Sequence, residues 1–393
     1  METNKIYRGD CGKVLRDFPA RSVDLIYADP PFFTNRFYEL IWNDGYELRA
    51  YEDRWNGGIE NYIAWMEPKL RECHRVLKDT GSMYLHCDYR ANAHLRILMD
   101  RIFGHEPLNE IIWHYRTGGV SKRWWAQKTD TIFFYAKGRE WTFNPIEVKE
   151  YYNDIYKPGF KPGWTDRKSG HDQNGYYHLV YMDNVWNIPG VFNMSKEYLG
   201  YPTQKPELLL ERIITASSAE GDIVMDPFCG CGTAIAVAHK MHRNWIGIDV
   251  SPAACNLMAD RIHRIDPQFN AVDGIIGMPK TLDEVKELKW FDFQNWVFQS
   301  LPFGRVSEKK VKDMGIDGYS LDRPVQVKQW GHKVGRPEVD KFEAAILRVN
   351  KKEGMIVAFD FSRDAYEEVA RVKNADNLDI ELRRVDSLIE RDE

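Results

Sequence analysis

Over the first two thirds of the chain, short apolar runs alternate with helical patterns of hydrophobic residues. The apolar runs have the length of strands and occupy residues 23–28, 82–86, 131–135, 223–225 and 245–248. The helical patterns occupy residues 62–77, 93–102, 207–217, 234–242 and 252–262. Because strands that alternate with helices usually build a parallel sheet covered on both faces, this order predicts an α/β fold with a mostly parallel sheet.

The alternation is interrupted in two places. Residues 140–185 are rich in Gly, Pro, Tyr, Asp and Asn, which predicts an insertion built of loops. After about residue 267 the alternation stops, and a helix over residues 282–300 and a second set of strands are expected. With 393 residues available, we expect two domains, each with its own core. The predicted division is a large domain at 1–270, a linker at 271–280 and a smaller domain at 281–393.

A glycine-bearing turn follows one of the predicted strands. Residues 221–233 read GDIVMDPFCGCGT, in which the strand ends at Asp226 and a helix begins at about Thr233. Such a turn brings backbone close to a ligand and directs helix N–H groups at it. The next strand ends in Asp249, an acid placed to accept hydrogen bonds from ribose hydroxyls. The pair predicts a nucleoside-binding site; the alternative is a generic Rossmann-like turn with a solvated acid.

A second motif, DPPF, follows the apolar run VDLIYA at residues 29–32. An exocyclic amine of adenine or cytosine is a poor nucleophile, because its lone pair is delocalised into the ring. The Asp29 carboxylate and the Pro30 carbonyl could each accept one N–H of such an amine and draw the nitrogen toward tetrahedral geometry. Pro30 and Pro31 would hold the acceptors rigidly, and Phe32 offers a flat face for an extruded base. The plainer interpretation is a strand end followed by a rigid turn.

With these motifs, residues 5–262 resemble the beta class of amino DNA methyltransferases of bacteria, archaea and phages. In that class the catalytic motif precedes the cofactor motif, as DPPF precedes DPFCGCGT here. The resemblance also rests on the segments RGDCGKVLRDFPARSVDLIYADPPF, GSMYLHCD, FGHEPLNEIIWHYRTGG and YPTQKPELLLERIITASS. It implies a Rossmann-like domain that transfers a methyl group from S-adenosylmethionine to duplex DNA. Because Asp29 opens the tetrapeptide, adenine N6 is expected, with cytosine N4 as the alternative.

The resemblance also implies roles for residues around the cofactor. Asp10 would lie near the adenine of the cofactor, and Asp249 would bind the ribose. Thr203 and Lys205 match the segment that closes over the cofactor. The methionine-side pocket would be formed by Asp226, Phe228, Gly230, Gly232 and Thr233.

The charge of the chain restricts how it could bind DNA. A net charge of −5 argues against a generally basic surface, so phosphate contacts require a local basic face. Residues 113–168 carry basic residues interleaved with aromatic ones, and the resemblance places a loop-rich target recognition insertion at about 114–190. The predicted DNA contacts are Arg116, Lys122, Arg123 and Lys128. The alternative is a solvated loop region with buried aromatics.

The smaller domain has a signature of its own. Asp317 lies in MGIDGYS, and Gln326 and Lys328 lie in VQVKQW. In this arrangement Asp317 and Gln326 could ligate Mg²⁺ while Lys328 positions an attacking water. Residues 315–361 resemble the Mrr-like branch of the PD-(D/E)xK nucleases, which implies a smaller α/β restriction-endonuclease-like fold. An acid often found in the first helix of that branch is not evident in FDFQNWV. Three hypotheses therefore stay open: Mg²⁺-dependent cleavage, DNA binding without cleavage, and a structural or dimerising appendage.

The remaining features concern location and partners. No apolar run reaches membrane-spanning length, the N-terminus METNKIYRGD lacks an apolar signal region, and the six cysteines are scattered. We expect a cytoplasmic protein of a prokaryotic cell or phage, without membrane or disulfides. A homodimer is a further expectation from the resembling class. A non-catalytic nucleic-acid-binding protein and an RNA-directed enzyme are the rival functions.

Overall fold

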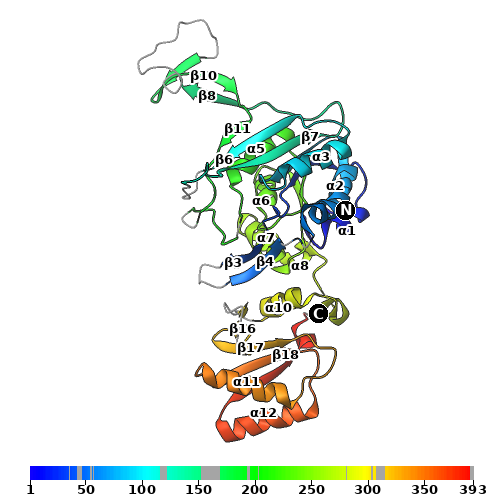
Figure 1. The fold of residues 1–393 in the computed structure, drawn as a ribbon, viewed down its shortest axis with the longest axis vertical. Coiled ribbons are helices and arrows are strands. Elements are labelled where there is room, and N and C mark those ends of the chain that lie inside the picture. The colour runs from blue at the N-terminus through cyan, green and yellow to red at the C-terminus, as the bar shows by residue number, and fades with distance from the viewer. Residues whose placement is uncertain are drawn as a thin grey trace.

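The molecule has a large body, a small sheet that projects from one end, and a second domain at the other end (Figure 1). The computed structural model describes residues 1–34, 36–41, 47–53, 55, 57–115, 122–151, 169–192, 195–201, 203–279, 281–301, 304–306 and 315–389. Within these residues, no helix is both long and apolar enough to cross a membrane.

The body is built on a nine-stranded sheet of order β11-β6-β7-β5-β2-β12-β13-β1-β14. Neighbouring strands are parallel except at β7, which runs antiparallel to both β5 and β6. The predicted α/β fold with a mostly parallel sheet is confirmed. The strands are β1 (Lys5–Arg8), β2 (Val23–Ala28), β5 (Leu77–Cys87), β6 (Asn109–His114), β7 (Thr129–Ala136), β11 (Val185–Asn187), β12 (Ile223–Asp226), β13 (Asn244–Asp249) and β14 (Ile275–Ile276).

Helices cover both faces of this sheet, because its strands are apolar on both sides. Successive residues of β2 point to opposite faces: Leu25 packs into one hydrophobic cluster and Ile26 into the other. The cluster around Leu25 includes α5 (Glu207–Ser217), α6 (Thr233–Lys240) and α7 (Pro252–Ile265). The cluster around Ile26 includes α1 (Cys11–Val14), η1 (Leu15–Asp17), α2 (Gly58–Val76) and α3 (Asn92–Phe103).

The strand order brings distant parts of the sequence to one edge of the sheet. Strands β2, β12, β13 and β1 are neighbours and parallel, so the residues after their carboxyl ends meet. The register pairs Met225 with Ile26 and Arg8 with Asp249. Because the connections lead away in opposite directions from β2 and β12, a crevice is expected outside their carboxyl ends.

The insertion differs from its prediction. Residues 140–185 are not built of loops alone, because they contain an antiparallel sheet of order β8-β10-β9. Its strands are β8 (Glu147–Tyr151), β9 (Ser169–Asp172) and β10 (Gly175–Tyr181), and they form the small projecting sheet in Figure 1. Strand β7 lies inside the range 114–190 yet belongs to the central sheet. A further hairpin joins β3 (Arg36–Ile41) and β4 (Glu47–Asp53).

The segment that leads to the second domain contains regular secondary structure. Within the segment predicted as a linker, α8 (Ala271–Gly274) is followed by β14, which pairs with β1. The helix predicted over residues 282–300 is two helices, α9 (Leu282–Lys286) and α10 (Trp290–Gln299). The helix is interrupted between them, and Lys289 has an extended backbone before the first turn of α10.

The second domain is a smaller α/β unit, as expected. Its sheet has the order β15-β16-β17-β18-β19, with β17, β18 and β19 parallel. Helices α11 (Arg336–Arg348) and α12 (Arg363–Asp376) cover one face, and α10 packs on the other. In Figure 1, α10 lies between this sheet and the body. The strands are β15 (Gly304–Val306), β16 (Gly318–Ser320), β17 (Arg323–Lys328), β18 (Glu353–Ala358) and β19 (Asp379–Arg384); η2 (Val385–Leu388) follows.

Candidate active site

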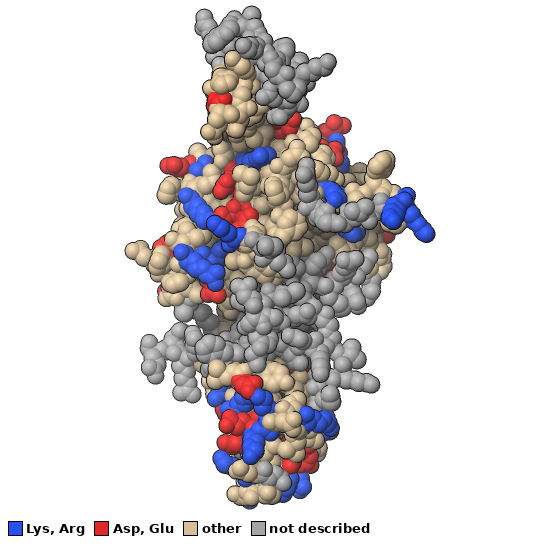
Figure 2. Space-filling view, turned by 90° about the vertical axis from the view of Figure 1, so that its left-hand side faces the viewer, with Lys and Arg blue, Asp and Glu red and all other residues tan. Residues whose placement is uncertain are grey.

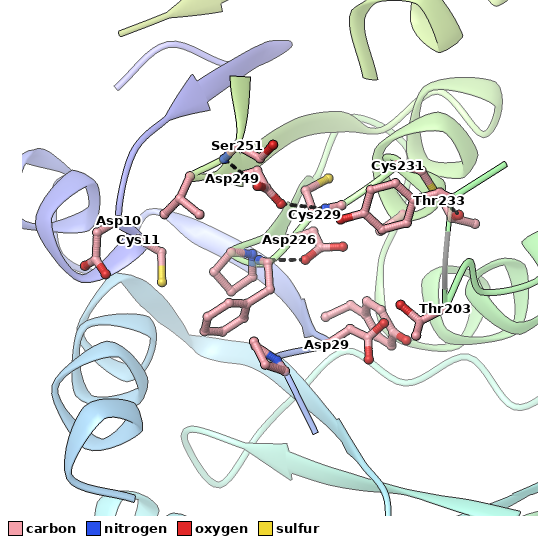
Figure 3. A pocket seen from close by; sticks show the side chains of 18 of the residues that line it. Asp10, Cys11, Asp29, Thr203, Asp226, Cys229, Cys231, Thr233, Asp249 and Ser251 are labelled. Atoms are coloured by element: carbon pink, nitrogen blue, oxygen red, sulfur yellow. Dashed lines mark hydrogen bonds between the residues drawn. The ribbon is translucent and has the colours of Figure 1, made fainter. Parts of the chain in front are cut away.

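A cavity of about 360 Å³ opens at the carboxyl ends of β1, β2, β12 and β13. Its size falls in the range of small-ligand sites. Figure 3 shows Asp10, Asp29, Asp226 and Asp249 around one space, although they come from separate parts of the sequence. Most of the residues predicted from the sequence line this cavity: Asp10, Asp29, Pro31, Thr203, Lys205, Asp226, Phe228, Gly230, Thr233 and Asp249. Pro30, Phe32 and Gly232 are beside it without lining it.

The turn after β12 requires glycine at two positions. Gly230 and Gly232 have φ values of 54° and 76°, in the left-handed region. A Cβ on Gly230 would lie 3.0 Å from the Tyr201 ring, and one on Gly232 would lie 2.8 Å from Met258 Cγ. Gly232 is also the N-cap of α6. The turn therefore packs closely against neighbouring side chains, and Gly230 lines the cavity.

We expect Gly232→Ala to lower the free energy of unfolding by about 2–4 kcal/mol, because left-handed strain adds to overpacking. Gly104→Ala is the matched control, since Gly104 has a φ of 78° and its Cβ would meet nothing within 4 Å. In this control the free energy of unfolding should therefore fall by only about 1 kcal/mol. Urea unfolding of both variants measures the difference, and equal losses would contradict the close packing at Gly232.

The Asp249 carboxylate holds the turns on either side of it. Its Oδ2 accepts a hydrogen bond from Gly230 N at 2.9 Å, and its Oδ1 accepts one from Ser251 N at 2.8 Å. Figure 3 shows both bonds. Burial raises the pKa of Asp249 to about 6. Each carboxylate oxygen has a second lone pair, so Asp249 can still accept hydrogen bonds from a ligand.

Asp226 is more deeply buried than Asp249. Burial raises its pKa well above the usual value, and the nearby Asp29 and Asp249 carboxylates add to the shift. Its Oδ1 accepts a hydrogen bond from Phe228 N at 3.0 Å. Asp226 therefore fixes the start of the glycine turn and favours the neutral form.

Two supporting residues of this turn were missed from the sequence. Arg261 of α7 is buried, and its Nη1 donates to Thr233 Oγ1 at 3.0 Å. Its Nη2 donates to a Glu207 carboxylate oxygen at 2.9 Å. Burial alone would raise the pKa of Glu207, but hydrogen bonds from Lys240 and Arg261 outweigh it and lower the pKa. A basic residue on the apolar face of a predicted helix was the signal available for Arg261.

Asp10, which follows β1 and also lines the cavity, is ion-paired. Lys69 Nζ lies 3.0 Å from Asp10 Oδ2 and 4.0 Å from the centroid of the Trp65 ring. Lys69 is buried and belongs to α2, whose helical pattern gave no reason to single it out. Lys69 therefore neutralises the acid that the resemblance places beside the adenine.

Asp29 directly follows β2, and its two carboxylate oxygens have different surroundings. Its Oδ2 accepts a hydrogen bond from Lys205 Nζ at 2.5 Å. Its Oδ1 is buried without a hydrogen-bond partner among the described residues, and His86 Nδ1 is 3.9 Å away. Lys205 Nζ also lies 4.9 Å from the centroid of the Phe32 ring. One acceptor of Asp29 is therefore held by the chain and the other is left for a ligand.

The tetrapeptide turn is held by residues far along the chain. The Tyr62 hydroxyl donates to the Pro31 carbonyl at 2.8 Å. The Asp53 carboxylate accepts from Phe33 N at 3.1 Å, and Phe33 has a φ of 59°. These contacts fix the turn on both sides of Phe32.

A buried polar network behind Asp29 was also missed. His86 of β5 is fully buried, with Nδ1 2.7 Å from the Tyr27 hydroxyl and Nε2 3.2 Å from Asp130 Oδ2. The Tyr115 hydroxyl donates to Asp130 Oδ1 at 3.1 Å. Burial would raise the pKa of Asp130, but the hydrogen bond and charge of His86 outweigh it, so the pKa is lowered. A histidine inside an apolar strand was the available signal.

The predicted DNA contacts lie between β6 and β7. Lys122 and Arg123 are exposed, and Lys128 is half-buried; Arg116 lies outside the described residues. Trp124 and Trp125 are 70% and 93% exposed, so these two aromatics are not buried. On the face seen in Figure 2, Lys and Arg gather on the body below the projecting sheet.

The second domain has a cavity of its own. It is lined by the three residues predicted there, Asp317, Gln326 and Lys328, and by Trp290, Gly315, Val327, Gln329 and Trp330. Gln326 is buried; its Nε2 donates to the Gly315 carbonyl at 2.9 Å, and its Oε1 has no partner among the described residues. Asp317 Oδ2 accepts from Val327 N at 2.7 Å. Oxygens of this kind suit Mg²⁺.

Glu338 of α11 is an acidic residue near this cavity that was not predicted from the sequence. Its Oε2 lies 2.9 Å from Lys328 Nζ, and its Oε1 lies 2.6 Å from Lys341 Nζ. Burial would raise the pKa of Glu338, but these hydrogen bonds outweigh it and lower the pKa. Asp292, the acid of FDFQNWV, is not among the residues that line the second cavity and lines the first instead.

The chain matches two protein-family models and several known proteins. Residues 23–260 match a family model described as DNA methylase, and residues 285–391 match one described as restriction endonuclease. The DNA adenine methyltransferase YhdJ of Escherichia coli K12 is 35% identical over 254 residues, which cover 64% of this chain and 79% of that protein. The type II methyltransferase M.HpaI of Haemophilus parainfluenzae is 30% identical over 67% of this chain and 74% of its own length.

Solved structures are similar at lower identity. The crystal structure of the M1.HpyAVI–SAM complex is 20% identical, covers 66% of this chain and 98% of that one, and has a TM-score of 0.43. The family match spans more than half of the chain and includes Asp29, Asp226 and Asp249. The chain therefore belongs to the DNA methylase family.

Proposed function

We propose that this protein transfers a methyl group from S-adenosylmethionine to adenine N6 in duplex DNA. The observation that carries the proposal is Asp29, which lines the cavity and whose buried Oδ1 has no hydrogen-bond partner among the described residues. A buried acceptor without a donor is costly, so a ligand that brings an N–H is expected there. An exocyclic amino group brings that donor.

The cavity residues fit S-adenosylmethionine. Asp249 has free lone pairs for ribose hydroxyls, and Gly230, which lines the cavity without a side chain, allows close approach of a ligand. Asp10 lies near Asp249, because Gly9 N donates to the Asp249 carbonyl at 2.8 Å, and Asp10 would contact the adenine. Asp226 and Thr233, which also line the cavity, would contact the methionine part. When bound, the cofactor supplies an electrophilic methyl group.

The residues around Asp29 would hold the target base. Asp29 Oδ1 accepts one amino hydrogen and the Pro30 carbonyl accepts the other, which localises the nitrogen lone pair. Lys205 holds Asp29 in position from Oδ2. Phe32, tilted against His86 at a centroid distance of 5.4 Å, offers a ring for the extruded base.

Adenine is proposed over cytosine for two reasons. Asp29 opens the tetrapeptide, and a relative with 35% identity is described as a DNA adenine methyltransferase. N4-methylation of cytosine is the second candidate, because the same acceptors suit that amine. Long-read sequencing of DNA from cells expressing the protein distinguishes N6-methyladenine from N4-methylcytosine. DNA identical to that of cells with an empty vector would contradict both and favour a non-catalytic DNA-binding protein.

For the second domain, we propose Mg²⁺-dependent cleavage of DNA. The support is the unpartnered Oε1 of Gln326 beside the Asp317 carboxylate and Lys328 in one cavity. Asp317 and Gln326 would hold the metal, and Lys328 would position the attacking water. Glu338 beside Lys328 supplies an acid near this site.

We expect Lys328→Ala to lower the rate of Mg²⁺-dependent cleavage at least 100-fold while the rate of methylation stays unchanged. Lys341→Ala is the matched control, because Lys341 also pairs with Glu338 but is 68% exposed in its side chain. Cleavage of plasmid DNA measures the first rate, and incorporation of labelled methyl groups measures the second. If the unmodified protein cuts no DNA with any divalent metal, the domain binds DNA or serves a structural role instead.

A further inference from the structure

The cavity assigned to the methyl donor has walls from both domains. Besides residues of the body, it is lined by Lys289 and Asp292, at the N-cap and in the first turn of α10. Both belong to the segment that matches the restriction endonuclease family model. This turn follows the interruption between α9 and α10.

Asp292 is placed as an acceptor for a ligand. Its side chain is half-buried, and burial raises its pKa while the charges of Arg8 and Lys289 act in the opposite direction. No residue in the described part of the chain donates a hydrogen bond to its carboxylate. Its charge also contributes to the raised pKa of Asp249, so the two acids act at the same end of the cavity. A nucleoside brings hydroxyl and amino donors that such a pair of carboxylates can accept.

The same turn is part of the second cavity. Trp290, between Lys289 and Asp292 in the chain, lines the cavity that contains Asp317, Gln326 and Lys328. The Leu288 carbonyl accepts a hydrogen bond from Gln329 Nε2 at 2.6 Å, and Gln329 follows Lys328 directly. The five residues 288–292 therefore contact both candidate sites.

We propose that residues 288–292 are a methyl-donor-binding element supplied by the second domain, in which Asp292 accepts a hydrogen bond from the nucleoside part of the donor. The bound donor then orders this turn, and through Trp290 and the Leu288–Gln329 bond it orders the wall of the second cavity. This inference rests on the proposed binding of S-adenosylmethionine in the first cavity.

A purely structural role for Asp292 has a different signature. Attraction between Asp292 and Arg8 could hold the two domains together without touching a ligand. In that case removal of the carboxylate would lower the melting temperature of the ligand-free protein and leave ligand affinity intact. Affinity and ligand-free stability must therefore be measured together.

The first experiment is calorimetric titration of the full chain with S-adenosylmethionine. We expect Asp292→Ala to weaken binding about tenfold, the loss of one hydrogen bond to a partly exposed carboxylate. Asp283→Ala is the matched control, because Asp283 lies on α9 with a side chain that is 90% exposed. The inference is wrong if Asp292→Ala binds with unchanged affinity, even where its ligand-free melting temperature falls. Absence of binding by the unmodified protein would instead overturn the proposed function.

The second experiment measures backbone hydrogen exchange with and without S-adenosylmethionine. We expect the ligand to slow exchange in residues 221–233, in α10 and in β17. In Asp292→Ala at saturating ligand, protection should persist in residues 221–233 and be lost in β17. Protection confined to the first domain of the unmodified protein would overturn the link between the two cavities.

Discussion

Asp29→Asn is expected to lower the rate of methyl transfer by about 10²–10⁴-fold, while the affinity for S-adenosylmethionine changes no more than a few-fold. The substitution keeps the shape of the side chain but replaces one acceptor oxygen with an N–H donor. The amide could then present that donor to the target amine at the position of Oδ1, which has no partner among the described residues. Transfer of labelled methyl groups to DNA and calorimetric titration with the cofactor separate the two effects.

Asparagine is preferred to alanine at this position. Lys205 is buried and donates to Asp29 Oδ2, so Asp29→Ala would leave a buried cation unpaired and destabilise the protein. Asp79→Asn is the control, because the Asp79–Arg21 ion pair is largely exposed and contributes little to stability. If Asp29→Asn retains more than a tenth of the activity, the assigned role of Asp29 is wrong.

Asp249→Ala is expected to weaken binding of S-adenosylmethionine by about 10–100-fold, the equivalent of one or two hydrogen bonds to a carboxylate. The loss has two sources: the acceptor for the ribose disappears, and the turns held through Gly230 N and Ser251 N loosen. Calorimetric titration measures the affinity, and an unchanged value would contradict the ribose contact.

The affinity should also depend on pH through Asp249. Its pKa is raised to about 6 by burial, so below that pH the protonated carboxyl is a weaker acceptor for the ribose. We expect the affinity to rise between pH 5 and pH 7. The α-carboxyl and α-amino groups of the cofactor titrate at about 3.5 and 8, outside this range. In Asp249→Asn this rise should be reduced or absent; an undiminished rise would assign the titration to another group.

The effect on stability has the opposite sign. Between pH 3.8 and about 6 the folded protein keeps a proton on Asp249 that the unfolded chain has released. The contribution of this group to the free energy of unfolding therefore falls as pH rises through that window and is constant above it. Higher pH thus favours ligand binding at Asp249 while it costs some stability.

Local patterns predicted the elements that carry the site. The run VDLIYA became β2 over the predicted residues, and Glu207–Ser217 became α5, because periodicity and flanking prolines are local signals. The glycines of the turn were recognisable because positive φ and close approach both require the absence of a Cβ. The break between α9 and α10 and the sheet of the insertion were not predicted, since composition alone does not report a bend or a long-range pairing.

The site residues divide in the same way. Asp29, Asp226 and Asp249 could be named from the sequence because each lies at the carboxyl end of a strand: Asp29 directly follows β2, and Asp226 and Asp249 end β12 and β13. His86, Lys69, Arg261 and Glu338 could not, because their roles arise from partners far along the chain, such as Lys69 with Asp10 and Arg261 with Thr233. Buried polar residues need partners, but the sequence does not say which ones.

The sequence by itself determined which functional groups are present: an acid before two prolines, a glycine turn after a strand, and a second acid at the end of the next strand. Only the tertiary structure decided which of these groups meet. The parallel order β2-β12-β13-β1 brings Asp29, Asp226, Asp249 and Asp10 around one cavity, and the first turn of α10 adds Asp292 from the second domain. The physical reason is that strand order and helix direction depend on packing between distant segments, whereas turn and strand patterns depend on neighbouring residues.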